Sequence, residues 1–137
     1  MLHKFIVLFL SIVIFTGCGY KQPFLTRSAT IVFKTPTIKY HDKCFIERYE
    51  DNVKLTILDV GVVVTDMTIY QDKICKNFIL CFDANSFNER FLDKSYERDF
   101  LYNLFTKEDI YFKDKEKSIL IKVIYDKEEK IENNATK

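Results

Sequence analysis

The most reactive side chains in this sequence belong to four cysteines and to His41. His41 lies three residues before Cys44, while Cys75 and Cys81 are separated by five residues. Together these four residues could form a tetrahedral zinc site, because imidazole nitrogens and thiolates are ligands that zinc prefers. In an oxidising compartment a disulfide is the simpler fate for the Cys75–Cys81 pair. We therefore expect no metal and no other cofactor.

The spacing of Cys75 and Cys81 suits a structural disulfide bond better than redox catalysis. Catalytic pairs have two residues between the cysteines, a spacing that this sequence lacks. A bond between the two would close a loop of about seven residues and stabilise the fold by roughly 2 kcal/mol on the chain-entropy estimate. Two alternatives stay open, since Cys44 could pair with either cysteine, or all three thiols could be reduced and buried.

Cys18 lies in a different context, at the end of a short apolar segment that follows Lys4. Residues 5–15 contain one polar residue, Ser11. As a helix, these residues would span about 17 Å, well short of the ~30 Å hydrocarbon core of a bilayer. A basic start, a short apolar stretch and small residues before a cut are typical of secretory signals. The sequence therefore predicts a signal peptide over residues 1–17.

Phe15-Thr16-Gly17-Cys18 resembles the lipobox of bacterial lipoproteins, although Phe15 stands where that pattern prefers Leu. The resemblance implies that signal peptidase cuts between Gly17 and Cys18 and that acyl chains such as palmitate are attached at the Cys18 thiol. Each buried methylene contributes about 0.8 kcal/mol, so two or three chains hold a protein on a membrane essentially permanently. An ordinary cleaved signal and an uncleaved anchor are the alternatives.

Gly19 follows the predicted lipidated cysteine. By resemblance to lipoprotein sorting signals, a residue other than Asp at this position implies export to the outer membrane. We therefore expect a cell-envelope protein, anchored by lipid at Cys18 to the outer membrane and facing the periplasm.

The charges of the sequence are balanced. Removal of residues 1–17 takes away Lys4 and no acid, which leaves 20 basic and 20 acidic side chains. A nucleic-acid-binding domain would carry an excess of basic residues, so we expect no nucleic-acid partner. The chain has 3 Gly and 2 Pro among its 137 residues, which argues against a disordered protein. Its length suits one domain of roughly 100 residues.

Hydrolase motifs are absent from the sequence. It contains no Gly-x-Ser-x-Gly, no glycine-rich phosphate loop and no His-Glu-x-x-His. His41 is the one histidine left after removal of the signal peptide. Neighbouring carboxylates, such as Glu97 with Asp99 or Glu108 with Asp109, are typical of solvated faces and helix starts. We therefore expect that the protein is not an enzyme and has no catalytic residues.

The chain is expected to form one domain over residues 29–125, between a lipidated tether at 18–28 and a charged, disordered tail at 126–137. Docking of Phe24 and Leu25 on the domain is the alternative for the end of the tether. Alternating and β-branched residues predict antiparallel strands. These strands cover residues 30–34, 37–40, 44–49, 53–57, 62–70, 110–112 and 118–125.

The hydrophobic period becomes helical after Cys81. Asp83 and Ser95 can each cap a helix, because their side-chain oxygens can accept hydrogen bonds from free backbone N–H groups at its start. Apolar residues at helical spacing follow the two caps. They are Phe87, Phe91 and Leu92 after the first, and Tyr96, Phe100, Leu101, Leu104 and Phe105 after the second. We expect these stripes to belong to the core, with a ligand groove as the alternative.

The segments 31–36 and 86–92, with the cysteine pair before the second, resemble small lipoproteins of Campylobacter- and Helicobacter-type bacteria. The resemblance covers residues 31–112 and implies an envelope lipoprotein, with no activity attached to it. Proteins of this kind more often carry a small residue at the position of Cys44. The resemblance thus implies an unpaired Cys44 and agrees with a bridge between Cys75 and Cys81.

The sequence as a whole predicts an α+β fold, with an antiparallel sheet of about five to six strands and two short helices packed on one face. We expect a lipid-anchored envelope protein that acts as a non-catalytic binding or assembly component. Its predicted partners are the membrane, through Cys18, and a further envelope protein. A periplasm-facing carrier of a small ligand, lipid or peptide is the alternative, and a small hydrolase is the least favoured interpretation.

Overall fold

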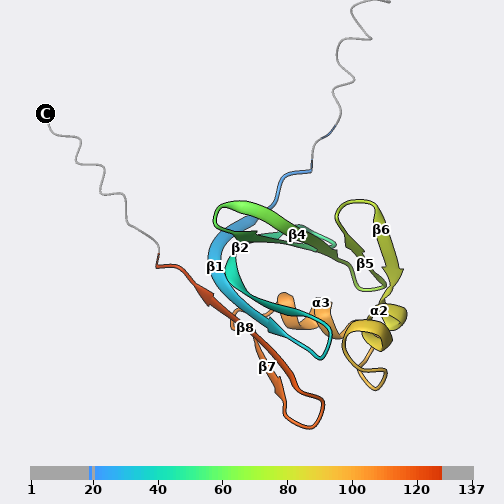
Figure 1. The fold of residues 1–137 in the computed structure, drawn as a ribbon. Helices are drawn as coiled ribbons and strands as arrows, with labels where there is room; N and C mark the ends of the chain where they lie inside the picture. The colour runs from blue at the N-terminus through green and yellow to red at the C-terminus, as the bar shows by residue number, and fades with distance from the viewer. Residues whose placement is uncertain (1–18, 20, 128–137) are drawn as a thin grey trace, which may run out of the picture.

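The computed structural model describes residues 19 and 21–127 and has one antiparallel sheet with two helices (Figure 1). The strands are β1 (Leu25–Lys34), β2 (Lys39–Arg48), β3 (Val53–Asp59), β4 (Val62–Ile69), β5 (Lys73–Lys76), β6 (Leu80–Asp83), β7 (Tyr111–Asp114) and β8 (Ile119–Tyr125). The helices are α2 (Ala84–Phe91) and α3 (Phe100–Phe105). The expected antiparallel α+β architecture is confirmed, but the expected strand number is wrong, because the sheet has eight strands.

The sheet places the first strand beside the last. The strand order is β6-β5-β4-β3-β2-β1-β8-β7, so that β1 is an interior strand. Along its whole length, Leu25–Lys34, it pairs with β2. Its second half, Ala29–Lys34, also pairs with β8. The consecutive hairpins from β1 to β6 and the C-terminal hairpin β7–β8 are therefore joined through β1.

Several strand boundaries differ from the sequence-based prediction. β5 and β6 have four residues each, too few for the alternation of apolar residues to identify them. The two strands expected at 37–40 and 44–49 form one strand, β2. Residues 25–28, assigned to the tether, belong to β1 and pair with residues 45–48. The predicted tether is therefore shorter at its C-terminal end, and the domain begins at Leu25.

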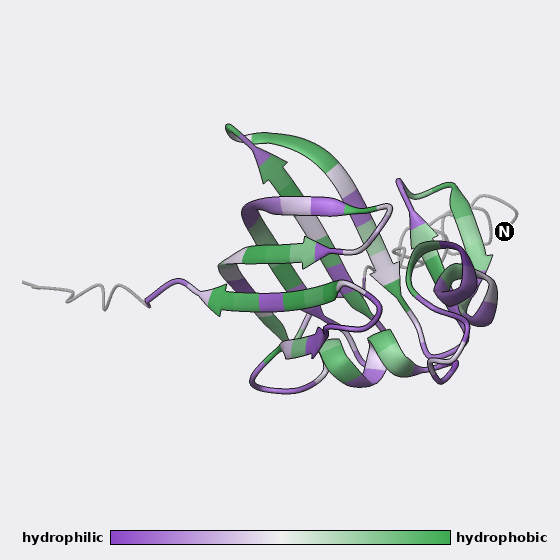
Figure 2. Cartoon of the chain, turned by 60° about the horizontal axis from the view of Figure 1, so that its bottom comes forward, coloured by the Kyte–Doolittle hydropathy of each residue, from purple (hydrophilic) through white to green (hydrophobic). Residues whose placement is uncertain are grey.

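Apolar residues fill the concave side of the sheet. In β1 the buried side chains are Ala29, Ile31 and Phe33, each 0% exposed, and the residues between them face outward. The same alternation recurs in β3 and β8, and Figure 2 shows hydropathy changing along the strands. Because neighbouring side chains of a strand point to opposite faces, this pattern gives the sheet one apolar side.

The two helices contribute to the same core. α3 lies on the concave side of the sheet, where the Phe105 ring stacks on Phe33 with 6.5 Å between centroids (Figure 1). α2 follows β6 directly and packs beside β5 and β6. Its residue Phe87 is 0% exposed and contacts the Phe82 ring edge-on. The expectation that the helical aromatic residues belong to the core is confirmed for Phe87 and Phe105.

One of the two predicted helix caps is present. Oδ1 of Asp83 accepts a hydrogen bond from the backbone N–H of Asn85 at 2.9 Å, as expected for the first residue before α2. Ser95 does not cap α3, because that helix begins only at Phe100. The backbone N–H of Ser95 donates instead to Oδ1 of Asp93 at 2.9 Å, which holds a turn between the helices.

The β3–β4 hairpin turns through two residues with positive φ, Val60 at 49° and Gly61 at 78°. Asp59 pairs with Val62 across the turn. Two-residue turns with positive φ at both positions favour Asn-Gly, since most side chains are strained in the left-handed region. Val60 is β-branched and 95% exposed, so its conformational strain is not offset by burial within the domain.

Replacement of Val60 by Asn should therefore stabilise the isolated domain. Relief of the left-handed conformation is expected to raise the free energy of unfolding by about 1 kcal/mol. Urea denaturation of the purified protein measures this change. Val62→Asn is the matched control, because Val62 lies in a strand and gains nothing from Asn. A Val60→Asn protein no more stable than the original would contradict the strain at this turn.

Candidate binding surface

The predicted lipidation and cleavage site lies outside the described residues. Gly17 and Cys18 precede the described segment, so the processing of this site stays a prediction. Within residues 21–127, neither helix has the length and apolar character needed to cross a bilayer.

The disulfide bond between Cys75 and Cys81 is present, with 2.04 Å between the two sulfur atoms. The cysteines face each other as a cross-strand pair in the β5–β6 hairpin. α2 begins three residues after Cys81, at Ala84. The bond therefore connects the two strands that lead into the first helix, and the predicted pairing is confirmed.

Cys44 and His41 lie on opposite faces of β2. Cys44 is unpaired and 1% exposed on the concave side, where burial raises the pKa of its thiol to about 12. His41 is exposed on the outer side. Within residues 21–127 no group of three or more His, Cys, Asp or Glu residues is placed to hold a metal ion. The four residues considered for zinc are therefore not brought together.

The neighbouring carboxylates Glu97, Asp99, Glu108 and Asp109 lie at the surface or at the start of a helix. Glu108 forms an ion pair with Arg27 at 3.2 Å and lies 4.0 Å from Arg48, while its own side chain is 80% exposed. These contacts join the start of β1 and the end of β2 to the segment after α3. Asp109 and Glu97 are exposed, and Asp99 occupies the position before α3 without making a side-chain cap.

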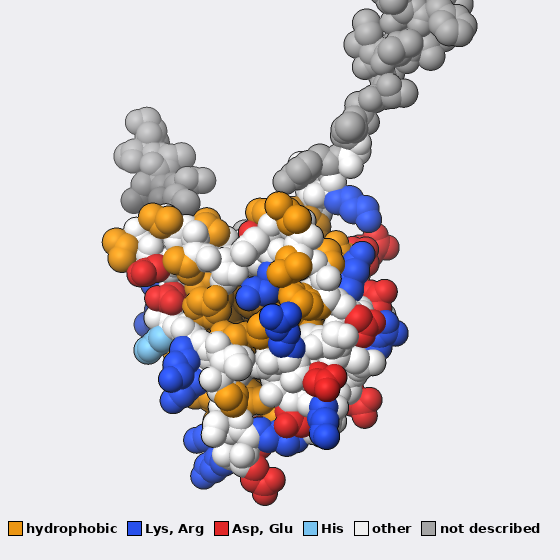
Figure 3. Space-filling view, turned by 45° about the vertical axis from the view of Figure 1, so that its right-hand side comes forward, with side chains coloured by type: hydrophobic (Ala, Val, Ile, Leu, Met, Phe, Trp, Pro, Cys, Tyr) orange, Lys and Arg blue, Asp and Glu red, His pale blue; other side chains and the backbone are white. Residues whose placement is uncertain are grey.

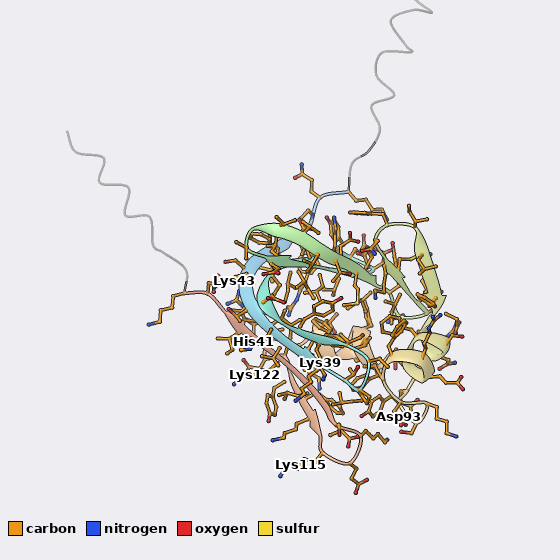
Figure 4. The ribbon with its side chains drawn as sticks, viewed as in Figure 1. Lys39, His41, Lys43, Asp93, Lys115 and Lys122 are labelled. Carbon is orange, nitrogen blue, oxygen red and sulfur yellow. A yellow bond between two sulfur atoms is a disulfide. The ribbon has the colours of Figure 1, made fainter. Side chains whose placement is uncertain are left out.

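Basic side chains gather on the outer face of β1, β2, β7 and β8. In the paired strands, Lys39 lies opposite Lys34, and His41 lies opposite Val32, whose other neighbour is Lys122. Figure 4 shows Lys43, His41 and Lys122 following one another along this side of the molecule. We call this surface the basic face. Its residues are Val32, Lys34, Lys39, His41, Lys43, Lys113, Leu120, Lys122 and Ile124.

Most of this positive charge is uncompensated within the described part of the chain. Lys43 is neutralised by Asp126, whose oxygen lies 2.8 Å from Nζ. That hydrogen bond, together with one from Ser28, holds the pKa of the Asp126 carboxyl below its usual range. Within residues 21–127, no carboxylate oxygen lies within 4.0 Å of the ammonium groups of Lys34, Lys39 or Lys122. These three ammonium groups are available to an external anion.

Two open pockets meet at Lys34. One has a volume of about 210 Å³ and the other of about 270 Å³. The first is lined by Val32, Lys34, Lys39, Tyr40 and His41, and the second by Lys34, Lys113, Asp114, Lys115, Ser118, Ile119 and Leu120. Asp114 is already engaged, since the Tyr96 hydroxyl donates to it at 2.8 Å and thereby lowers the pKa of the carboxyl. The lysines around Lys34 are therefore the groups free to contact a ligand.

The chemistry that this arrangement can perform is recognition of negative charge beside apolar contact. Lys ammonium groups donate hydrogen bonds to carboxylate or phosphate oxygens, while Val32, Leu120 and Ile124 offer apolar surface between them. The sequence did not reveal this surface, because its lysines are dispersed from position 34 to position 122. Pairing of β1 with both β2 and β8 brings them together.

Comparisons of the chain with protein-family models, with curated proteins and with solved structures found no match. The resemblance of its motifs to small lipoproteins of Campylobacter- and Helicobacter-type bacteria therefore stays a prediction.

The buried thiol of Cys44 should resist alkylation in the folded protein. With a pKa of about 12, only about one thiol in ten thousand is ionised at pH 8, and the thiolate is the reactive form. Iodoacetamide at pH 8, followed by peptide mass spectrometry, should leave Cys44 unmodified until guanidinium unfolds the chain. Rapid and complete alkylation of the native protein would show that the thiol is accessible.

Proposed function

We propose that this protein is held on the bacterial envelope by lipid at Cys18 and acts there as a non-catalytic binding or assembly component. The basic face is its proposed binding surface. One observation carries this proposal. Within the described residues, the ammonium groups of Lys34, Lys39 and Lys122 have no carboxylate partner. The outer membrane, on its periplasmic side, is the proposed location.

The placement of the titratable residues favours binding over catalysis. His41 is flanked on the paired strands by Val32 and, beyond it, by Lys122, and within residues 21–127 no ion pair joins it to a carboxylate. A general base must reach the substrate proton that it removes, and a catalytic imidazole is held in place for this step by an orienting carboxylate. This placement of His41 therefore supports binding rather than hydrolysis as the function.

The filling of the interior favours a surface binder over a carrier. Between sheet and helices, the large side chains of Phe33, Phe87, Leu101 and Phe105 are fully buried members of one hydrophobic cluster. A carrier of a lipid or peptide would need part of this space for its ligand. We therefore expect the proposed partner to bind the outer face of the sheet.

The chemistry of the basic face suits an envelope protein with an acidic surface. Complementary charges accelerate encounter and fix orientation, while the intervening apolar residues supply contact area. Balanced total charge is compatible with this proposal, because attraction depends on where the charges lie on the surface.

Reversal of charge on the basic face should release the partner. In a pull-down of lipidated protein after mild detergent extraction, Lys34→Glu with Lys122→Glu is expected to lower partner recovery about tenfold or more. Lys94→Glu with Lys107→Glu makes the same change of charge away from this face and should leave recovery unchanged. If the protein recovers no partner, or if both double variants recover it equally, the proposed surface is wrong.

Loss of the Cys18 thiol should abolish the anchor. Cys18→Ala is expected to accumulate as a full-length precursor without acyl chains, because the predicted lipid attachment and cleavage both require the cysteine. Metabolic labelling with a palmitate analogue and the mass of the purified chain measure the two effects. Normal processing and undiminished labelling of Cys18→Ala would exclude Cys18 as the anchor.

A further inference from the structure

Exposed hydrophobic side chains are concentrated at one end of the domain. Of the eleven large hydrophobic residues that are exposed within the described residues, eight lie in three segments: the residue before β1, the tip of the β3–β4 hairpin and the tip of the β5–β6 hairpin. We call these eight the apolar end. They are Phe24, Val60, Val62, Val63, Val64, Phe78, Ile79 and Leu80.

The three segments lie on the same side of the molecule. Both hairpin tips and the blue start of β1 lie along the upper edge of Figure 1, and Figure 3 shows hydrophobic side chains along this upper surface. Nζ of Lys54 is 4.6 Å from the centroid of the Phe78 ring. Lys54 pairs with Glu47, which pairs with Thr26 at the start of β1. With neighbouring strands about 4.8 Å apart, the Lys54 backbone lies about 10 Å from that start.

Both hairpins carry a large apolar residue at a position with positive φ, which such residues rarely adopt. Val60 has φ of 49° and Phe78 has φ of 62°, in the left-handed region that Gly and Asn adopt most readily. Their side chains are 95% and 71% exposed, so the domain gains little burial in return for the strain. Apart from the contact of Lys54 with the Phe78 ring, further burial of these side chains requires a surface outside the domain.

We propose that the apolar end docks on the lipid surface of the membrane to which Cys18 is anchored. This inference rests on the proposed lipid anchor. Six residues, 19–24, separate Cys18 from the first residue of β1, and fully extended they reach about 20 Å. The anchor thus keeps the start of β1 close to the bilayer, and both hairpin tips lie along the same upper edge of the molecule as that start (Figure 1). Burial of apolar surface in the interface adds to the binding that the acyl chains supply.

This orientation would leave the basic face free for its partner. Figure 4 places Lys115, at the β7–β8 turn, at the end of the molecule opposite to the upper edge. With the apolar end on the membrane, that turn and the adjoining lysines point away from the bilayer. The lipid would then fix the direction in which the domain presents the basic face as well as its location.

Tryptophan substitutions test the docking, since the chain has no Trp of its own. Val62→Trp and Phe78→Trp each place a single fluorophore at one hairpin tip, and Tyr111→Trp places one on β7 as the control. Tyr111 is 57% exposed and lies outside the apolar end. Each mature, lipidated protein, beginning at Cys18, is reconstituted into phosphatidylcholine vesicles with or without brominated acyl chains. Flotation of the vesicles reports whether the anchor holds the protein.

Docking predicts a shift of the emission of both tip probes to shorter wavelength and their quenching by brominated lipid, with neither effect at position 111. Val62→Asp in the Phe78→Trp protein should reverse the quenching.

If the protein floats but the tip probes behave like position 111, docking is overturned while the proposed anchor stands. If the protein does not float, the anchor and the docking that rests on it both fail. A blue shift without lipid that grows with protein concentration would assign the apolar end to a second protein chain, which also overturns docking.

Discussion

The pairing of β1 on both of its edges is the constraint on which the rest of the structure depends. β2 lies along one edge and β8 along the other, so that this strand unites two parts of the chain far apart in sequence. Its inner residues form a row in the core that reaches α3 through the contact of Phe33 with Phe105. Its outer residues bring lysines of β2 and β8 onto one surface. The pairing of β1 with β2 and β8 thus forms the core on one face of the sheet and the basic face on the other.

Local patterns in the sequence predicted the local features of this fold. Alternation identified β3 and β8, a carboxylate at Asp83 marked the start of α2, and the spacing of Cys75 and Cys81 suggested their bond. β5 and β6 escaped prediction because four residues are too few to establish a period, and their pairing depends on the turn between them. The basic face escaped because it arises from the contact of β1 with β8, which no local pattern encodes.

Balanced composition does not mean an even surface. The sequence from Cys18 onward has equal numbers of acidic and basic residues, which removes any expectation of strong overall attraction to anions. On the fold, five lysines and His41 lie at outward positions of β1, β2, β7 and β8, and Glu47 is the one acid at an outward position of those four strands. Exposed apolar groups collect at the two hairpin tips. The surface is therefore divided into a basic face and an apolar end, and the total charge of the protein describes neither of these two regions.

The attachment of the tether directly to β1 also determines how the domain responds to mechanical load. A pull at the N-terminal side of Leu25 acts along the strand axis, parallel to ten residue pairs with β2 and six with β8. Hydrogen bonds between strands run across that axis, so they are loaded in shear and share the force instead of opening one after another. Under the proposed anchor at Cys18, the domain would resist extraction at its most extensively paired strand. Tension between an anchored lipid and a bound partner would be carried by the sheet, leaving the helices largely unstrained.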